Sequence, residues 1–410
     1  MLIAAWIAAL VAVYLIQYRI FRDHSFDGVR YDVTLSTDEV FEGEDVFLYE
    51  EILNVRLLPL PFVKVDTRLP DGLRYRLIEE EGEERRGTFA QSVQSVFVLR
   101  PHQRIRRTWR VNCAVRGEYS IGEVVLVTND LVGFDQQSKT ITVKPSAKNH
   151  LVVLPRTVGL ERNFTASRYI SGDTLSIRGL VSDPLRLCGV REYAPGDPMK
   201  RINWKSTAVH GALMVNVEEF TRRHAFNLVM NMNSRDIERV PGPPAIPAFV
   251  EGCVTVTASI LDAVSSENIR VRLITNTVPP AAGEDMLVPV ERIPAGEEDG
   301  EDEERCVFVS PPLAGKNQML DALRLLAMLP MEISVSVEKM LDDILDRPTL
   351  YAPEGNLLVV SSYLSERMIH FFYGMQRQGI DVIFYVTNTV GNAAIIPDDV
   401  PVFYKTHWEE

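Results

Sequence analysis

The chain has 410 residues, 46% of them hydrophobic, so it exceeds one ordinary core and predicts two or three domains. A formal net charge of -13 argues against a broad nucleic-acid-binding surface. Cysteine usage favours a reducing compartment over a disulfide framework and offers no zinc-site spacing, because the four residues stand far apart: Cys113, Cys188, Cys253 and Cys306.

The N-terminal segment is apolar enough to predict a membrane anchor. Met1 to Ile16 carry no charge, and the apolar character continues, with two interruptions, to Phe21. A membrane helix needs roughly 17 to 25 predominantly apolar residues, so residues 1–22 are predicted as an anchor helix. Arginines follow at positions 19, 22 and 30, so the positive-inside rule predicts a single-pass protein of the cell membrane with its body in the cytoplasm. The reversed topology, an exported adhesin, is the weaker alternative.

Residues 31–148 predict a small antiparallel β-sandwich. Short alternating segments are separated by Gly, Pro and Asp or Asn, which is typical of strands joined by turns. The strand-like segments are 31–35, 45–49, 62–65, 95–99, 108–111 and 124–127. The basic run 104–107 is interpreted as the solvated face of a strand rather than an anion site. This domain shows no catalytic pattern, so we expect an interaction or spacer module.

The stretch from Arg191 to Val209 combines a turn, aromatic residues and cations. Pro195 fixes φ and Gly196 can take positive φ, so a tight turn is expected at Ala194–Asp197. Two interpretations stay open. In a structural clasp, which these residues alone favour, the aromatic side chains pack and the ions pair internally; in a docking surface they anchor a partner. The residues concerned are Arg191, Tyr193, Gly196, Asp197, Arg201 and Trp204.

Beyond residue 224 the pattern changes to alternating strands and helices. Segments 226–230, 271–274, 357–360 and 382–386 read as strands, and segments 248–264, 316–328 and 365–377 read as helices. This alternation predicts a mainly parallel, Rossmann-like α/β sheet over residues 224–405, with its ligand edge at the carboxyl ends of the strands. Prolines, glycines and an acidic run predict a mobile surface insertion at about 279–305; an acidic docking tail is the alternative.

Three segments resemble the bacterial family known as domain of unknown function 58 (DUF58). Arg191–Trp204 follow its pattern R-x-Y-x-x-G-D-x-x-R/K-x-I-x-W, Arg116–Gly122 resemble its R-G-x-Y-x-x-G segment, and Thr128–Phe134 resemble its D-x-x-G segment. Thr207 and Val209 depart from the serine and arginine usual in the family. On this resemblance, residues 149–223 form a family-type segment that joins the two domains.

The resemblance also implies that the C-terminal domain is of the von Willebrand factor A type. Such domains often bind Mg²⁺ after their first strand through D-x-S-x-S, because hard oxygen ligands suit that ion. In the equivalent stretch, Asn231 replaces the aspartate of this pattern. Asn233 replaces the first serine, and Arg235 replaces the second. We therefore predict no conventional metal site and no cofactor.

Enzyme motifs are missing from the sequence. There is no G-x-x-x-x-G-K-[ST], no H-E-x-x-H and no G-x-S-x-G. Proteins similar to this family are commonly encoded beside MoxR-type AAA+ ATPases, which implies such a partner. The preferred hypothesis is a membrane-anchored, non-enzymatic adaptor. The alternative is a membrane-associated hydrolase or transferase with Asp197 as acid or base and Arg191 and Arg201 as anion clamps.

Overall fold

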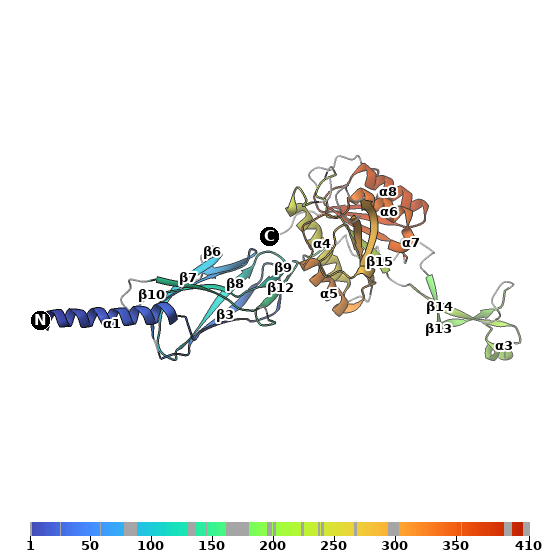
Figure 1. Cartoon of the computed structure of the whole chain (residues 1–410). Coiled ribbons are helices and arrows are strands. Elements are labelled where there is room, and N and C mark those ends of the chain that lie inside the picture. The colour runs from blue at the N-terminus through green and yellow to red at the C-terminus, as the bar shows by residue number, and fades with distance from the viewer. Residues whose placement is uncertain are drawn as a thin grey trace. The chain divides into compact units, whose positions relative to one another are not determined.

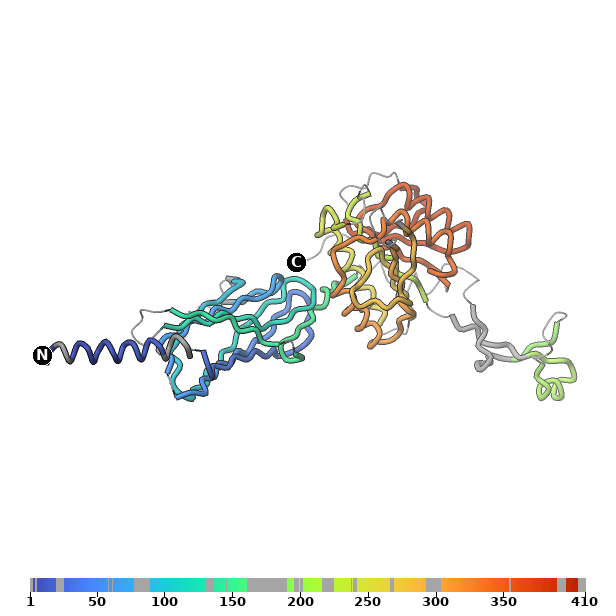
Figure 2. The backbone as a smooth tube through the Cα atoms, in the orientation of Figure 1, coloured from blue at the N-terminus to red at the C-terminus, as the bar shows by residue number. Residues whose placement is uncertain are grey.

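The computed structural model describes the chain apart from residues 1, 25, 58, 78–87, 130–135, 145, 161–179, 195–198, 200–201, 223–224, 237, 239–241, 266–268, 294–302, 354, 389–395 and 405–410. The chain forms two compact units (Figures 1 and 2). The first unit comprises residues 1–157 and 323–329, and the second comprises residues 158–322 and 330–410. The boundary at residue 157 lies inside the predicted joining segment 149–223.

The N-terminal helix α1 (Leu2–His24) covers the predicted anchor. Within the described residues, its apolar stretch Trp6–Arg19 is shorter than a membrane span. In the same described part of the chain, the helix that meets the length and hydropathy of a span is α4 (Pro247–Val264), and 61% of that stretch is buried. Burial of this kind is typical of a core helix. Helix length and hydropathy therefore give weak evidence of a membrane protein and do not support single-pass placement through α1.

The first unit is the predicted β-sandwich, and its strands alternate because inward apolar residues face a common core. One sheet has the order β1 (Val29–Leu35), β3 (Asp45–Asn54), β8 (Arg104–Cys113), β5 (Leu73–Leu77), β6 (Thr88–Ala90). The second has the order β11 (Gln136–Thr142), β10 (Glu123–Asn129), β4 (Leu60–Arg68), β7 (Ser92–Leu99). A third, small sheet has the order β2 (Glu39–Phe41), β12 (His150–Leu154), β9 (Gly117–Ser120). The core of the first unit contains buried apolar side chains, among them Leu48, Ile52, Val65, Leu99 and Leu126.

The DUF58-like pattern falls on a two-stranded ribbon that we call the motif hairpin. It consists of β13 (Leu180–Glu192), α3 (Trp204–His210) and β14 (Met214–Arg222), and the two strands pair antiparallel. Asn203 caps the N-terminus of α3, where its side chain accepts a hydrogen bond from the Ser206 N–H, and Gly211, with φ of 71°, caps the C-terminus. The predicted turn at 194–197 lies largely outside the described residues.

The second unit contains a seven-stranded sheet with the α/β pattern expected from the sequence. Its order is β17 (Leu287–Ile293), β18 (Glu303–Val309), β16 (Arg270–Thr275), β15 (Ala225–Met230), β19 (Leu357–Ser361), β20 (Val382–Val386), β21 (Val402–Tyr404). The five strands from β16 to β21 in this order are parallel. From β15 the chain goes first to β16 on one side and later to β19 on the other, so the strand order reverses beside β15.

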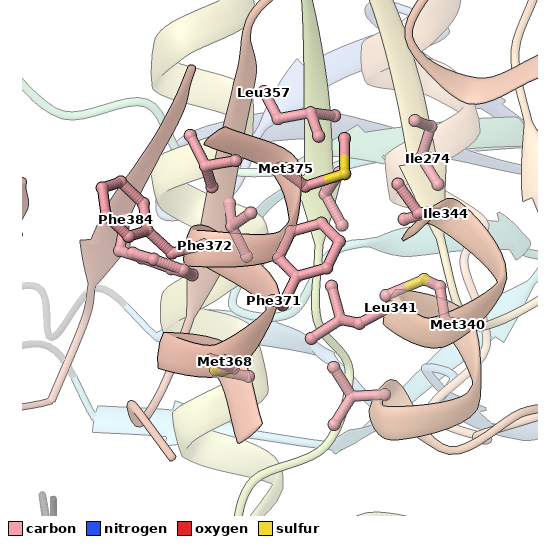
Figure 3. Close-up of a cluster of buried hydrophobic side chains, with 14 of the residues drawn as sticks. Ile274, Met340, Leu341, Ile344, Leu357, Met368, Phe371, Phe372, Met375 and Phe384 are labelled. Atoms are coloured by element: carbon pink, nitrogen blue, oxygen red, sulfur yellow. The ribbon is translucent and has the colours of Figure 1, made fainter. Parts of the chain in front are cut away.

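Helices α6 (Val337–Asp346) and α8 (Glu366–Arg377) contribute to a cluster of buried apolar side chains on this sheet (Figure 3). Phe371 and Phe372 of α8 and Met340 of α6 lie among Ile274, Leu357 and Phe384 of the strands. Helix α4 packs against β15 and β19. The remaining helices are α5 (Gly315–Ala327), α7 (Pro348–Tyr351) and the short η3 (Glu284–Met286).

The predicted mobile insertion at 279–305 is wrong for much of its length. Residues 287–293 form β17 and residues 303–309 form β18, and the two pair antiparallel with a register shift after Pro289. The alternating apolar residues of Leu287–Ile293 drive strand formation in spite of the proline, which an edge strand tolerates. Residues 294–302, which hold most of the acidic run, lie outside the described residues.

Candidate functional site

The carboxyl ends of β15 and β19 meet at the point where the strand order reverses. In open α/β sheets this position is the usual place for ligands, because the loops that follow the two strands diverge there. The loop after β15 carries Asn231, Asn233 and Arg235, the predicted degenerate metal position, and the loop after β19 carries Ser361 and Ser362. The structure thus brings the predicted stretch to the predicted edge of the sheet.

Asn233 is the centre of a buried hydrogen-bond network at this edge. Its backbone N–H donates to Asn231 Oδ1 at 2.8 Å, and its Oδ1 accepts from Asn276 Nδ2 at 2.8 Å and from the Val337 N–H at 3.2 Å. Asn276 also accepts from the Met232 N–H at 2.8 Å. Hydrogen bonds therefore join the three amide residues, which come from two strand ends.

Hydroxyl groups after β19 complete the network. Asn231 Nδ2 donates to Ser361 Oγ at 3.0 Å, and Ser362 Oγ lies 3.2 Å from Asn233 O and 3.1 Å from Ser234 O. Sequence reasoning missed Asn276, Ser361 and Ser362. The available signal was their position directly after predicted parallel strands, whose carboxyl ends share one edge of the sheet.

This donor set does not fit the Mg²⁺ that the resemblance implies. The amide nitrogens of Asn231 and Asn276 are donors and cannot ligate a cation, and the Asn233 oxygen is already shared by two N–H groups. Arg235 is exposed beside this network. No group of three or more His, Cys, Asp or Glu residues that could hold a metal occurs in the described part of the chain.

A cleft of about 1030 Å³ opens above the same strand ends. Its wall carries Arg235, Asp236, Ser362 and Tyr363 from the two loops and Arg367 from α8. Arg367 pairs with Asp342 and lies 4.0 Å from Glu338, so two of the charged groups on the α6 side are matched. Burial raises the pKa of the Tyr363 phenol above its ordinary value. The cleft can accept a polar ligand or a partner loop.

The motif hairpin has a small core of its own and leaves its tryptophan outside it. Ile202, Met214 and Val215 are buried at 7%, 7% and 1% exposure. Trp204 is 67% exposed, and Val209 on the same helix is 77% exposed.

The polar residues of the pattern are only partly described. Arg191 donates to Glu192 O at 3.0 Å, and Tyr193 is half-buried. Gly196, Asp197 and Arg201 lie outside the described residues, so the hypothesis of an acid at Asp197 clamped by arginines stays untested.

The R-G-x-Y segment holds a helix end in the sandwich unit. Arg116 is 6% exposed and its Nη1 donates to the carbonyl oxygens of Leu326, of Ala327 at 3.2 Å and of Leu329 at 3.1 Å. A cation at a helix C-terminus satisfies carbonyls that lack intrahelical partners. Residues 323–329 belong to this unit. The arginine of the pattern therefore caps α5.

The tyrosine of the same segment is fixed beside the arginine. The Tyr119 hydroxyl donates to Val115 O at 2.8 Å. Gly72, with φ of 102°, makes room for this ring, because a Cβ there would collide with the phenol. The segment is thus a structural element of the sandwich.

A buried carboxylate in the sandwich was not predicted. Glu50 is 1% exposed and accepts four hydrogen bonds: from Tyr31 (2.9 Å), Thr67 (2.6 Å), Arg107 (2.9 Å) and Trp109 (2.6 Å). Arg107 was expected on a solvated face and instead reaches inward. Burial is the main reason why the pKa of Tyr31 is raised, and the neighbouring Glu50 carboxylate is the second. Because every oxygen of Glu50 is matched, this cluster is structural.

Comparison with known proteins supports a similarity to one protein family of unknown function. A family model described as "Protein of unknown function DUF58" matches residues 189–292, which contain the Arg191–Trp204 pattern, and this match supports the DUF58 resemblance. A search of curated proteins finds no match.

Solved structures give weak similarities. The sporulation control protein Spo0M of Bacillus subtilis is 16% identical, with 29% of this chain and 50% of that chain covered and a TM-score of 0.16. The CARDB domain of the PF1109 protein of Pyrococcus furiosus, crystallised with di-metal ions, is 13% identical, with 32% and 91% covered and a TM-score of 0.18. A putative membrane anchored protein of Corynebacterium diphtheriae is 10% identical, with 31% and 36% covered and a TM-score of 0.21. Scores of this size carry no argument about function.

Proposed function

We propose, from the premise that this chain is a member of the DUF58 family, that it is a membrane-attached, non-enzymatic adaptor. In this proposal a partner protein binds the motif hairpin, and the partner that we propose, as the family resemblance implies, is a MoxR-type AAA+ ATPase. The α/β unit, which we relate to von Willebrand factor A domains, acts as a scaffold whose strand-end network is neutral and internally bonded.

The exposure of Trp204 carries the proposal. A structural clasp needs its aromatic side chains packed, whereas Trp204 is 67% exposed and Met199, on the same stretch, is 71% exposed. Tryptophan and arginine are the residues that most often anchor protein interfaces, because they bury a large area with few rotatable bonds. Trp204 is therefore a candidate anchor rather than part of a core.

Exposed apolar side chains along α1 support membrane attachment. Ile3, Trp6, Leu10 and Ile16 are 77%, 70%, 67% and 62% exposed. A helix that is apolar and has no protein neighbour to cover it is stable in a bilayer or under detergent, not in water. We propose that α1 anchors the chain with its body in the cytoplasm.

The test is affinity purification of the full-length protein from its native membrane in detergent, followed by mass spectrometry. We expect wild type to recover an AAA+ ATPase and Trp204→Ala to recover less by about tenfold or more, as for truncation of an interface anchor. Leu57→Ala is the matched control, because Leu57 is 80% exposed and lies in the sandwich unit. It should recover the ATPase like wild type.

Other outcomes separate the parts of the proposal. An ATPase recovered equally with wild type and Trp204→Ala removes the hairpin from the binding surface. Preparations that never contain an AAA+ ATPase contradict the identity of the partner.

A further inference from the structure

Strand β7 forms an edge of the second sandwich sheet. Among the described strands it pairs only with β4, and β11 forms the opposite edge of the same sheet. An edge strand presents a row of unpaired backbone N–H and C=O groups, and these groups can pair with another strand.

β7 lacks the features that usually prevent such pairing. Its sequence, Ser92–Leu99, contains no charge, no proline and no glycine, and Val96 and Val98 on its outer side are 58% and 56% exposed. Water-exposed valines on an eight-residue edge strand are unfavourable for a monomer, since natural edges are normally short, charged or interrupted.

The other edges of the sandwich and of the α/β sheet show those protective features. β1 carries exposed Arg30 and Asp32, β11 carries exposed Lys139, and β17 contains Pro289. β6 and β21 have three residues each. Within the described strands of these sheets, β7 is thus the edge that is long, uncharged and apolar.

We propose that β7 pairs antiparallel with β7 of a second copy of this chain. Side chains on one face recur every two residues, so an antiparallel two-fold pair brings Val96 and Val98 of one copy beside the same face of the other. Because the strand has no charge, self-pairing places no like charges opposite each other. The pairing is isologous and closes at two copies.

The proposal is independent of the partner assigned to the motif hairpin. A pair of eight-residue strands is a small interface, so the dimer forms at micromolar rather than nanomolar concentration in solution. Copies attached to one membrane would meet at a higher effective concentration than copies in solution.

Sedimentation of the full-length protein in detergent, over about two decades of concentration around 10 µM, tests this pairing. We expect a reversible dimer for wild type and a dissociation constant raised by about tenfold or more in Val98→Lys, because a lysine on an edge strand opposes pairing with a second strand. Phe47→Lys is the matched control. Phe47 is 47% exposed but lies on β3, which has a strand on each side. It should dimerise like wild type.

A second variant keeps the test valid if Val98→Lys does not fold. In Gln94→Lys the new amine can pair with Asp66, which already accepts a hydrogen bond from Gln94 at 2.9 Å, so the sheet keeps its cross-strand contact. Far-ultraviolet circular dichroism and the thermal transition report folding of each variant. A wild type that stays monomeric, lysine variants that dimerise like wild type, or open-ended assemblies would overturn the proposal.

Discussion

Glu50 in the sandwich and Asn233 in the α/β unit are both buried polar side chains, but the first carries a charge and the second does not. Glu50 accepts four hydrogen bonds, one of them from Arg107, whereas Asn233 exchanges bonds with two further amides. A buried charge depends on each partner, because leaving it unpaired is costly. In a neutral amide network the stabilisation is shared among several weaker hydrogen bonds, so the loss of one bond costs less. The sandwich should therefore be the more sensitive unit to a single substitution.

Glu50→Leu should have the largest effect. It leaves Arg107 and the Tyr31 hydroxyl without their acceptor, and removal of one partner from a buried pair costs about 4 kcal/mol. Denaturant unfolding followed by tryptophan fluorescence measures the loss. Glu51→Leu is the control, because the Glu51 side chain is 36% exposed and its ion pair with Arg104 is a surface one, contributing less than about 1 kcal/mol. Equal losses in both variants would contradict the assignment of Glu50 as a structural centre.

Asn233→Ala should cost less, about 2 to 3 kcal/mol, because it removes the acceptor of Asn276 and of the Val337 N–H while the other bonds persist. The same unfolding measurement applies, with Gln376→Ala on the exposed side of α8 as the control. A loss larger than that of Glu50→Leu would reverse the comparison between the two units.

Alkaline pH should weaken the sandwich through Cys113. Burial, helped by Asp45 and Glu44, raises the pKa of its thiol from 9.0 to about 12. The unfolded thiol loses its proton at lower pH than the folded one, so the stability is present below pH 9 and is lost as pH rises from 9 to 12. The slope is at most about 1.4 kcal/mol per pH unit. Unfolding free energies at successive pH values should fall more steeply for wild type than for Cys113→Ala; parallel curves would contradict this.

Mg²⁺ should have the smallest effect. Because the strand-end amides bond to one another, we expect about 10 mM MgCl2 to leave the melting temperature of the wild type within about 1 °C of the metal-free value. Differential scanning calorimetry with and without EDTA measures the shift. A saturable rise with Mg²⁺, absent with NaCl of equal ionic strength, would show that the α/β unit retains a cation site.

The periodicity of apolar residues predicted the positions of many strands and helices. The same periodicity could have predicted the pair formed by Glu50 and Arg107. In β3, Glu50 has the inward parity of Leu48 and Ile52, and in β8, Arg107 has the inward parity of Trp109. The two residues lie directly opposite in the register. Reading the basic run as one solvated face ignored that alternate residues of a strand point to opposite sides.

Other features had no local signal in the sequence. The hydrogen bonds of Asn233 join its loop to three other segments of the chain, and although two of these follow predicted strands, no spacing rule indicates which side chains bond to each other. Pro289 and the acidic run led to the prediction of a loop where the structure has a pair of strands. Pairing of β17 with β18 stabilises the strand conformation, which the local sequence does not favour by itself.

Arg116 has a consequence for how the protein is made. Its side chain binds carbonyls of residues 326–329, so the sandwich unit lacks a part until that segment has been synthesised. From Thr157 to Leu329 a ribosome adds residues for about 10 to 30 s at the usual rates of synthesis. During that interval Arg116 of the nascent sandwich lacks the carbonyl acceptors that it has in the complete chain. A protein whose first unit closes this late depends on its second unit for the timing of its own folding.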